Sequence, residues 1–382
     1  MASQQTDLAM KRFFYPLTSF VCAILFGVVM QLAIGMAVGR CSEPAYQYQL
    51  PIIQDYPLPQ EATLFGEPVP LKDLYVIERL DREFTIIVWD RPQVLMWLKR
   101  GGRYFPYIEK QLAAAGLPDD LKYIAVAESS FHSSIKSRVG AGGIWQFMPE
   151  TAKDHGLEEK PGIDERNDFH KATVSAIQYL RNLHRIFGNW TLAVAAYNCG
   201  EGRVKNEMEI QKISSFYQLK LPPETERYLF RILSIKLIME NPKKYGYFLS
   251  QERIYSPYNI DVVKVHLKIP ADIADVANRM NVTYREIKEL NPHLTSRNFP
   301  SGQYSISIPS GKEEAFRKAL RDNTVAEVKQ TARHPDAYYT VKKGDTLINI
   351  SIKTGVSVQT LRSLNQLNHG KIRVGQKLAL QP

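Results

Sequence analysis

Residues 117–130 read LPDDLKYIAVAESS and carry the clearest structural signal in the chain. A proline and two aspartates at positions 118–120 are typical of the first turn of a helix. The apolar residues that follow recur at the spacing of one helical face, and Glu128 falls on this face seven positions after Leu121. Because an ionised carboxyl group is unfavourable among apolar side chains, the pattern predicts that the pKa of Glu128 is raised.

A carboxyl group with a raised pKa can act as a general acid on a glycosidic oxygen near neutral pH. The alternative is an ordinary helix-terminal glutamate that bonds to a backbone amide. Two downstream segments favour the catalytic interpretation. The first, residues 137–152, reads SRVGAGGIWQFMPETA, where the glycines let the backbone approach a ligand and Gln146 offers a donor and an acceptor. Trp145 either stacks on a sugar ring or belongs to the core.

The second segment, residues 195–204, reads AAYNCGEGRV. It places the phenol of Tyr197 and the amide of Asn198 before a glycine-rich helix end. Both groups suit the recognition of an N-acetyl sugar, which presents hydroxyl and amide groups. Taken singly, each segment is compatible with ordinary packing, so the prediction of a sugar-binding site depends on their occurring together.

Helical periodicity extends from Asp73 to about Tyr247, for example over residues 170–187 and 228–239. This block contains almost none of the alternation that is typical of strands, so we expect an all-α domain. The stretch before it, residues 39–72, contains six prolines without helical periodicity, which indicates an extended linker.

The C-terminal part contains an internal repeat. Residues 281–292 read NVTYREIKELNP and residues 355–367 read GVSVQTLRSLNQL, so that Asn291 aligns with Asn365 at an offset of 74. Each segment follows another short helical pattern and lies between two short alternating strands. We therefore expect two small β-α-α-β modules, separated by a charged, helix-prone connector.

The N-terminus is expected to direct export. Residues 1–12 end in a basic pair, and the uncharged run at residues 13–38 is long enough to span a bilayer as a helix. A cleaved signal peptide usually has a shorter apolar region, so an uncleaved anchor is favoured. Two alternatives stay open: cleavage near residues 37–39, and a lipidated N-terminus at Cys41, although Arg40 stands where lipoprotein signals usually carry a small residue.

The net charge of +10 and the pI near 9.3 favour an anionic partner, which could be an anionic membrane, an acidic wall polymer or nucleic acid. We expect no nucleic-acid partner, because basic blocks interleaved with aromatic residues and zinc-ligand spacings are missing from the sequence. Three scattered cysteines do not form a disulfide framework, and the histidines lack ligand spacing, so we expect no metal and no organic cofactor.

Together these segments resemble the soluble lytic transglycosylase family, which has a goose-lysozyme-like α fold. The resemblance covers roughly residues 75–250. The segments that carry it are Glu128-Ser129, Gly143–Pro149, Ala196–Asn198, residues 164–180 and residues 224–228. The C-terminal modules resemble LysM peptidoglycan-binding modules. The second is a good match, whereas the first has Pro270-Ala271-Asp272 in place of Gly-Asp-Thr, which leaves its glycan binding open.

The resemblance implies non-hydrolytic cleavage of the β-1,4 bond between MurNAc and GlcNAc in peptidoglycan, leaving a 1,6-anhydro-MurNAc end. It implies that Glu128 is the catalytic acid and base. The implied substrate-binding residues are Ser129, which would orient Glu128, Gln146, Met148, Tyr197, Asn198 and Tyr228, which would lie near Glu128. The implied glycan-binding residues of the second LysM module are Gly344, Asp345, Thr346 and Asn365.

Two other functions stay open. A hydrolytic muramidase on the same fold would need a second carboxylate, for which Glu201, Asp164 and Glu224 are candidates. A non-catalytic wall-binding protein would not need a carboxyl group on an apolar face beside a glycine-rich loop.

We therefore expect a mainly α chain with two small α+β modules, working in cell-wall turnover or remodelling. Its expected location is the bacterial cell envelope, membrane-anchored, with the catalytic domain facing the periplasm or the exterior. The expected domains are a cytoplasmic region (1–12), an anchor or signal segment (13–38), a proline-rich linker (39–72), the catalytic domain (73–250), a degenerate LysM-like module (262–310), a charged linker (311–337) and a LysM module (338–382).

Overall fold

A computed structural model describes residues 54–331, 338–354, 356, 358–367 and 372–380. The chain divides into two units, Met1–Asp55 and Tyr56–Pro382, and the described residues belong almost entirely to the second. The run at 13–38, predicted to be an anchor or a signal segment, lies outside the described residues, as does Cys41. Within the described part of the chain, no helix is both long and apolar enough to cross a membrane.

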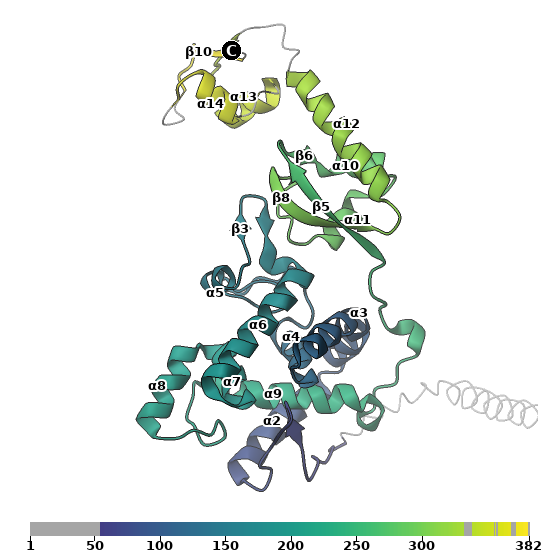
Figure 1. Ribbon diagram of the computed structural model, residues 1–382, viewed down its shortest axis with the longest axis vertical. Helices are drawn as coiled ribbons and strands as arrows, with labels where there is room; N and C mark the ends of the chain where they lie inside the picture. Colours follow the sequence, from purple (N-terminus) through teal and green to yellow (C-terminus); the bar gives the residue numbers. More distant parts are fainter. Residues whose placement is uncertain (1–53, 332–337, 355, 357, 368–371, 381–382) are drawn as a thin grey trace, which may run out of the picture. The chain divides into compact units, whose positions relative to one another are not determined.

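The block predicted to be all-α consists mainly of helices, which confirms the mainly α class (Figure 1). Its helices are α2 (Leu74–Trp89), α3 (Arg91–Ala115), α4 (Lys122–Ser129), α5 (Pro149–Asp154), α6 (Phe169–Phe187), α7 (Trp190–Cys199), α8 (Glu201–Gln211) and α9 (Pro223–Glu240). Short 3-10 turns are η1 (Asp119–Leu121), η2 (Glu165–Asn167), η3 (Pro242–Tyr245) and η4 (Gln251–Arg253). One buried apolar cluster, extending from Leu64 to Tyr247, holds these elements together.

Helix α7 lies at the centre of this domain. Its residues 190–196 are all buried, because the sequence is apolar on every side rather than on one stripe. Helix α6 packs along it, and α8 and α9 contact it as well. The last residues of α7 are only half-buried, so the central helix ends with Tyr197, Asn198 and Cys199 at the domain surface.

The end of the proline-rich segment is folded. Strands β1 (Thr63–Leu64) and β2 (Glu67–Pro68) form a hairpin, and Leu64 and Phe65 are buried in the core of the helical domain. The backbone amide of Phe65 donates to the Asp120 carboxylate at 2.7 Å. The segment predicted to be a linker therefore contains residues that pack as part of the domain.

The first β-α-α-β module has the predicted order of elements. Its elements are β5 (Ile260–Leu267), β6 (Ala271–Asp272), α10 (Ile273–Arg279), α11 (Tyr284–Leu290), β7 (Asn298–Phe299) and β8 (Gly302–Pro309). Strands β5 and β8 pair antiparallel over their whole length, and β6 pairs with β7. Helix α12 (Glu313–Thr331) packs on α10 and buries Phe316 and Ala319 in the module core. The first part of the predicted charged linker therefore belongs to this module.

The second module repeats the pattern with β9 (Tyr338–Thr340), α13 (Leu347–Thr354), α14 (Val358–Leu364) and β10 (Lys377–Ala379). The aligned asparagines make the same bonds in both modules. The Asn291 amide donates to Ile287 and Ser307 carbonyls and accepts from the Ser307 amide. The Asn365 amide does the same with Leu361 and Ala379. Each asparagine thus ties the second helix of its module to the last strand.

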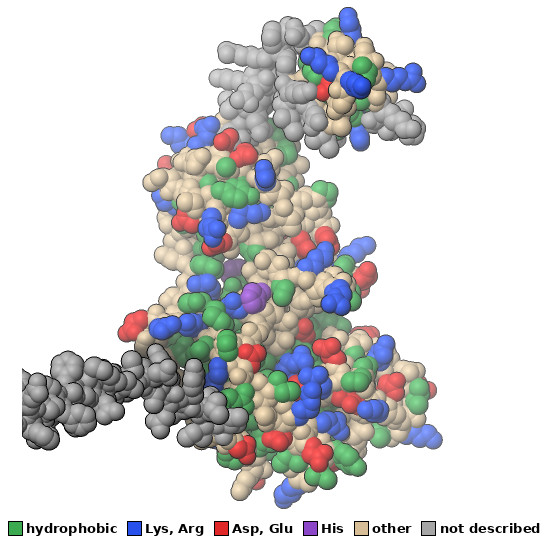
Figure 2. All heavy atoms as spheres, turned by 180° about the vertical axis from the view of Figure 1, so that it is seen from behind, with side chains coloured by type: hydrophobic (Ala, Val, Ile, Leu, Met, Phe, Trp, Pro, Cys, Tyr) green, Lys and Arg blue, Asp and Glu red, His purple; other side chains and the backbone are tan. Residues whose placement is uncertain are grey.

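The surface charges on one face of the molecule are mixed. In Figure 2, the Lys and Arg side chains on the visible face are interspersed with Asp and Glu side chains. On this face, the excess of basic residues does not form one continuous basic patch.

Candidate active site

Both ends of helix α4 are fixed by hydrogen bonds to neighbouring elements. Before its first turn, the Asp120 carboxylate accepts from the Lys236 ammonium of α9 at 2.8 Å. At its other end, Ser130 has a left-handed backbone with φ of 53°. Its hydroxyl oxygen accepts from the Gln93 amide at 2.6 Å and from the Trp97 indole at 2.9 Å, both on α3. Glu128, near the end of α4, therefore has a well-defined position.

The predicted apolar face of α4 is confirmed, because Leu121, Ile124 and Ala125 are fully buried. Burial raises the pKa of Glu128 to about 7. The buried Tyr228 phenol of α9 donates a hydrogen bond to Glu128 Oε1 and acts in the opposite direction, as does the Arg231 guanidinium. The Glu224 carboxylate adds to the increase. At neutral pH, the carboxyl group of Glu128 is thus protonated far more often than an ordinary glutamate.

A cavity of about 540 Å³ opens beside Glu128. The side chains that line it with Glu128 include Gln146, Met148, Tyr179, Tyr197, Asn198 and Glu224. They come from α4, the loop before α5, the middle of α6, the end of α7 and the first turn of α9. The structure therefore brings four of the predicted substrate-binding residues around one site. A fifth, Tyr228, bonds directly to Glu128.

The glycine-rich segment forms a tight loop that carries Gln146. Gly142 and Phe147 exchange backbone hydrogen bonds of 3.0 and 3.1 Å, which close the loop. Gln146 itself has a left-handed backbone with φ of 50°, an uncommon conformation for a residue with a Cβ atom. Its side-chain amide nitrogen donates to the Gly143 carbonyl at 2.8 Å and to the Ile135 carbonyl at 3.3 Å. The side chain is therefore held in place with its carbonyl oxygen free of these two bonds.

This loop packs against a buried arginine, Arg166, which is 1% exposed. Arg166 Nη1 donates to the Gly140 carbonyl at 2.9 Å, and Arg166 Nη2 pairs with the Asp164 carboxylate at 2.7 Å. A Cβ atom on Gly143, whose φ is 77°, would lie 1.9 Å from the Arg166 carbonyl oxygen. Only glycine fits at position 143, which explains the glycine there.

Tyr197 and Asn198 bond mainly to neighbouring protein groups. The Tyr197 hydroxyl donates to the Trp145 carbonyl at 2.7 Å, which connects α7 to the Gln146 loop. The Asn198 side-chain oxygen accepts from the buried Thr225 hydroxyl at 2.7 Å. This bond leaves the Asn198 amide nitrogen available to a ligand in the cavity.

The surroundings of Trp145 decide between its two alternatives, whereas the role of Ser129 stays open. Trp145 is fully buried and its indole donates to the Thr173 hydroxyl at 3.0 Å, so it belongs to the core rather than to a sugar-stacking surface. The Ser129 hydroxyl donates to the Ala125 carbonyl of its own helix at 3.1 Å. An orienting bond from Ser129 to Glu128 stays a prediction.

The three candidate second carboxylates differ in their surroundings. Asp164 is engaged with the buried Arg166, and Glu201 pairs with Lys205 one turn along α8. Glu224 lines the cavity, its side chain is 72% exposed, and it lies 3.7 Å from the Arg231 guanidinium. Of the three, Glu224 is the carboxylate placed beside Glu128.

The predicted glycan-binding residues of the second module also have internal roles. Gly344 has φ of 86° in the turn before α13. The Asp345 carboxylate accepts from the Tyr339 hydroxyl and the Lys342 amide, both at 2.8 Å. Thr346 is exposed. Both N–H groups of the Asn365 amide are used by backbone carbonyls, so they are not available as donors to a glycan.

Two residues that shape the site were not predicted, Arg166 and Thr225. Both are polar residues in segments that also resemble family segments, and nothing in their own spacing indicates burial. Among the described residues, no group of three or more His, Cys, Asp and Glu side chains could hold a metal ion. Cys199 lines the cavity, and burial raises the pKa of its thiol.

Residues 106–219 match the family described as Transglycosylase SLT domain, and residues 339–381 match the LysM domain. The membrane-bound lytic murein transglycosylase D of Escherichia coli (strain K12) is 30% identical over 292 residues, which cover 74% of this chain and 64% of that protein. The N-acetylmuramoyl-L-alanine amidase sle1 of Staphylococcus aureus (strain USA300) is 31% identical over 103 residues, which cover 27% of this chain and 29% of that protein.

Among solved structures, the 70 kDa soluble lytic transglycosylase SLT70 of Escherichia coli matches with a TM-score of 0.34 and 22% identity. The match covers 47% of this chain and 31% of that one. The chain spans 64% of the length of the transglycosylase relative from Escherichia coli.

Proposed function

We propose that this chain, whose residues 106–219 match the transglycosylase SLT domain and whose residues 339–381 match the LysM domain, is a lytic transglycosylase that cleaves peptidoglycan glycan strands. The observation that carries the proposal is the Glu128 carboxyl group, whose pKa burial raises to about 7, at the edge of a cavity large enough for sugar residues. The helical domain is proposed to have a goose-lysozyme-like fold.

The proposed reaction uses one carboxyl group twice. Glu128 donates its proton to the glycosidic oxygen as the bond from that oxygen to C1 of MurNAc breaks. The resulting carboxylate then accepts the proton of the 6-hydroxyl of the same MurNAc, whose oxygen attacks C1 and closes a 1,6-anhydro ring. Glu128 ends protonated, as it began. A tethered nucleophile has a very high effective concentration, so a second catalytic carboxylate is not needed.

The other groups at the site have proposed positioning roles. The Tyr228 phenol, which donates to Glu128, keeps the carboxyl group oriented and stabilises its ionised state between the two steps. The Gln146 carbonyl oxygen and the Asn198 amide nitrogen are proposed to bind the N-acetyl groups of the glycan. Met148, which is exposed at the cavity, would contact a sugar face. Tyr197 holds the Gln146 loop through Trp145.

A hydrolytic muramidase is the second candidate, because Glu224 lies at the cavity and could activate water as a second carboxylate. Its high exposure and its position in the first turn of α9 fit a helix-terminal ion-pair partner better. Replacement of Glu224 by Gln separates the two mechanisms, since only the hydrolytic one loses most of its turnover. A non-catalytic wall-binding protein is the third candidate. It would give no cleavage, whether position 224 is Glu or Gln.

The remaining parts of the chain suit work on the cell wall. The LysM domain is proposed to hold the enzyme on glycan strands, with Gly344, Asp345 and Thr346 at the contact. The apolar run at residues 13–38 is proposed to attach the protein to a membrane, with the catalytic domain on the outer side. We propose wall turnover or remodelling as the context of the reaction.

Digestion of purified peptidoglycan tests the proposal. The wild-type chain should release soluble fragments, and Glu128→Gln should lose activity by about a hundredfold or more, because a general acid contributes about 10² to 10⁴. Glu209→Gln, which removes an exposed carboxylate from α8, is the matched control and should keep wild-type activity. Substantial lysis by Glu128→Gln would exclude this residue from the mechanism.

A further inference from the structure

The first β-α-α-β module is bound to the helical domain through backbone pairing. In the helical domain, the hairpin of β3 (Glu159–Lys160) and β4 (Ile163–Asp164) meets the loop that follows α11 of the module. The Asp164 amide donates to the His293 carbonyl at 2.8 Å, and the Thr295 amide donates to the Gly162 carbonyl at 2.9 Å. The module thus joins the hairpin through an isolated antiparallel β-bridge.

Buried side chains also contribute to this contact. Ile163 and Leu294 face each other in an antiparallel bridge, and each is only 1% exposed. Ile163 belongs to the buried core of the module although it comes from the helical domain. At Gly162, a Cβ atom would lie 3.2 Å from the Ser296 hydroxyl and 3.4 Å from Pro300. Such close approach and burial are typical of a permanent intramolecular interface rather than of a mobile tether.

A second contact fixes the chain that leads into the module. The Tyr255 amide donates to the Lys99 carbonyl of α3 at 2.9 Å. The Arg103 guanidinium of α3 donates to the Tyr258 hydroxyl at 2.9 Å and lies 4.1 Å from the centre of its ring. Two separate attachments, at α3 and at the hairpin, hold the module against the helical domain.

Strand β4 of the hairpin leads directly to Arg166, the residue that packs against the loop of residues 137–147. The amide of Asp164 is held by the module, and its carboxylate is paired with Arg166 through bonds of 2.9 and 2.7 Å. Arg166 bonds to the Gly140 carbonyl and packs its own carbonyl against Gly143. Gly143 is three residues before Gln146 and accepts from the side chain of Gln146. A continuous set of contacts therefore runs from the module to the cavity.

We infer that the first module is a positioning element of the catalytic domain, which holds the loop of residues 137–147, and with it Gln146, through Ile163, Asp164 and Arg166. The core of the first module includes Ile163 of the helical domain, whereas the described core of the second module consists of that module's own residues. The catalytic consequence of this inference rests on the proposed function. The mechanical part, the dependence of the loop on the module, does not.

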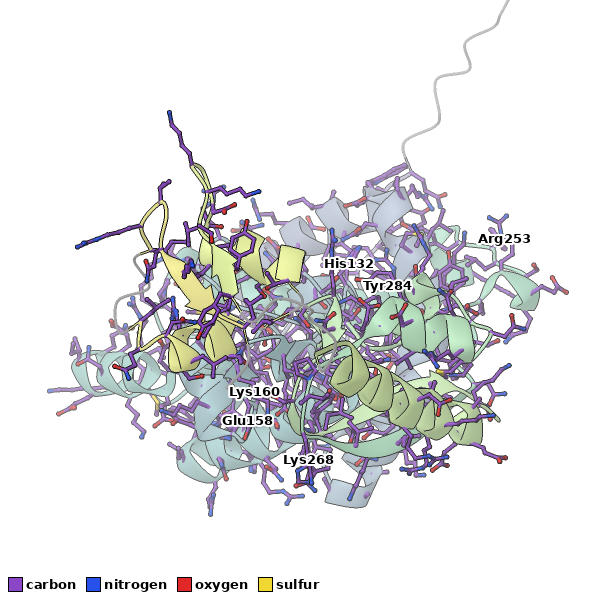
Figure 3. The ribbon with its side chains drawn as sticks, turned by 90° about the horizontal axis from the view of Figure 1, so that it is seen from above. His132, Glu158, Lys160, Arg253, Lys268 and Tyr284 are labelled. Carbon is purple, nitrogen blue, oxygen red and sulfur yellow. The ribbon has the colours of Figure 1, made fainter. Side chains whose placement is uncertain are left out.

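Hydrogen–deuterium exchange on the full-length chain tests the mechanical part. Ile163→Ala removes the side chain that enters the module core, and Asp164→Asn weakens the pair with Arg166 without removing the Asp164 amide. Glu158→Ala is the matched control, because Glu158 directly precedes β3, is exposed, and its side chain pairs with Lys160 (Figure 3).

Both test variants should exchange the amides of residues 137–147 about tenfold faster than the wild type, since local opening governs this exchange. Ile163→Ala should also speed exchange at residues 293–299, whereas Asp164→Asn and the control should not. Faster exchange at 293–299 with wild-type exchange at 137–147 would overturn the inference. If Ile163→Ala fails to fold, Ile163→Val should give a smaller change in the same direction. Exchange at residues 137–147 that stays at the wild-type rate in both Ile163→Val and Asp164→Asn would also overturn the inference.

Steady-state kinetics on soluble glycan chains test the catalytic consequence. Ile163→Ala should raise KM several-fold while kcat stays within about twofold, because the variant loosens the substrate-binding loop and leaves Glu128 in place. If the loop of a variant exchanges faster but its KM is unchanged, the position of Gln146 does not matter for catalysis. If the wild-type chain has no lytic activity, the proposed function is wrong. The exchange experiment would still test whether the loop depends on the module.

Discussion

The ionisation of Glu128 is set by opposing contributions from its neighbours. Burial raises its pKa to about 7, and the hydrogen bond from the Tyr228 phenol is the largest contribution in the other direction. The carboxyl group is protonated, and able to donate, below this pH. We therefore expect kcat/KM to decline on the alkaline side with an apparent pKa near 7.

Replacement of Tyr228 by Phe removes this hydrogen bond. We expect the pKa of Glu128 to rise, so the alkaline limb of kcat/KM should move to higher pH while the maximal rate falls about tenfold through lost orientation. Tyr245→Phe is the control, since Tyr245 is equally buried but packs on Phe84 and Tyr56 away from the site. An alkaline limb that stays in place or moves to lower pH would contradict the assigned role of Tyr228.

The same pKa shift predicts a dependence of stability on pH. The folded state binds the Glu128 proton more tightly than the unfolded state, whose carboxyl group titrates near 4.5. The free energy of unfolding therefore falls as pH rises from about 4.5 to about 7, because Glu128 must ionise in a buried place. Glutamine does not titrate, so Glu128→Gln should gain about 2 kcal/mol over the wild type between pH 5 and pH 8.

Urea unfolding at these two pH values measures this difference, with Glu209→Gln as a correction for the loss of a surface carboxylate. A stability difference between Glu128→Gln and the wild type that does not change with pH would mean that Glu128 ionises normally in the folded state.

Single residues were predictable where an apolar pattern contained an anomaly. Glu128 stands out on the buried face of α4, and the structure places it beside Gln146, Tyr197 and Asn198, which two other segments contribute. The use of Asn365 in tying α14 to β10 was not predicted, because an asparagine before a turn suits both a ligand contact and a backbone contact. Only the bonds of its amide distinguish the two.

At the scale of elements, the Gln146 loop depends on the absence of a side chain at position 143. Gly143→Ala should lose about 2 kcal/mol or more beyond the usual cost of alanine at positive φ, because its Cβ atom would collide with the Arg166 backbone. Gly156→Ala is a close control, since Gly156 has the same φ of 77° and nothing lies within 4 Å of its Cβ position. Equal losses of stability in thermal unfolding would show that the loop does not need this close contact.

The elements themselves were predictable to different degrees. The long helices follow from their spacing, and the repeat identified two β-α-α-β modules. The hairpin of β3 and β4 was not predicted, because strands of two residues leave no alternation in the sequence. Arg166 was missed for a related reason. An arginine is expected at the surface unless its partners are known. The partner of Arg166 is Asp164, which lies only two positions away, across a turn.

At the scale of the whole molecule, the two modules should make different contributions. The core of the first includes Ile163 of the helical domain, whereas the described core of the second contains only its own residues, such as Ile350, Leu361 and Leu378. A chain that ends at residue 331 should keep its thermal stability and its kcat on soluble glycan chains. Its binding to insoluble peptidoglycan should weaken about tenfold or more, because a tethered second site raises the effective concentration of enzyme at the wall. Cosedimentation with purified peptidoglycan measures this loss, and unchanged binding would assign wall attachment to another part of the chain.

The domain limits illustrate what the sequence leaves undetermined. Proline content predicted a linker up to residue 72, yet Leu64 and Phe65 pack in the core of the helical domain. The charge of residues 311–337 predicted a connector, yet α12 buries Phe316 in the first module. In both segments a few apolar residues determine the packing. The average composition of a segment does not reveal such single residues.

The central claim is that one carboxyl group cleaves the glycan without the addition of water. Digestion of peptidoglycan in water labelled with oxygen-18, followed by mass spectrometry of the released fragments, tests it directly. We expect MurNAc ends that are lighter than reducing ends by one water and that contain no label. Reducing ends that carry one labelled oxygen would show that water attacks C1, and would contradict the proposed mechanism.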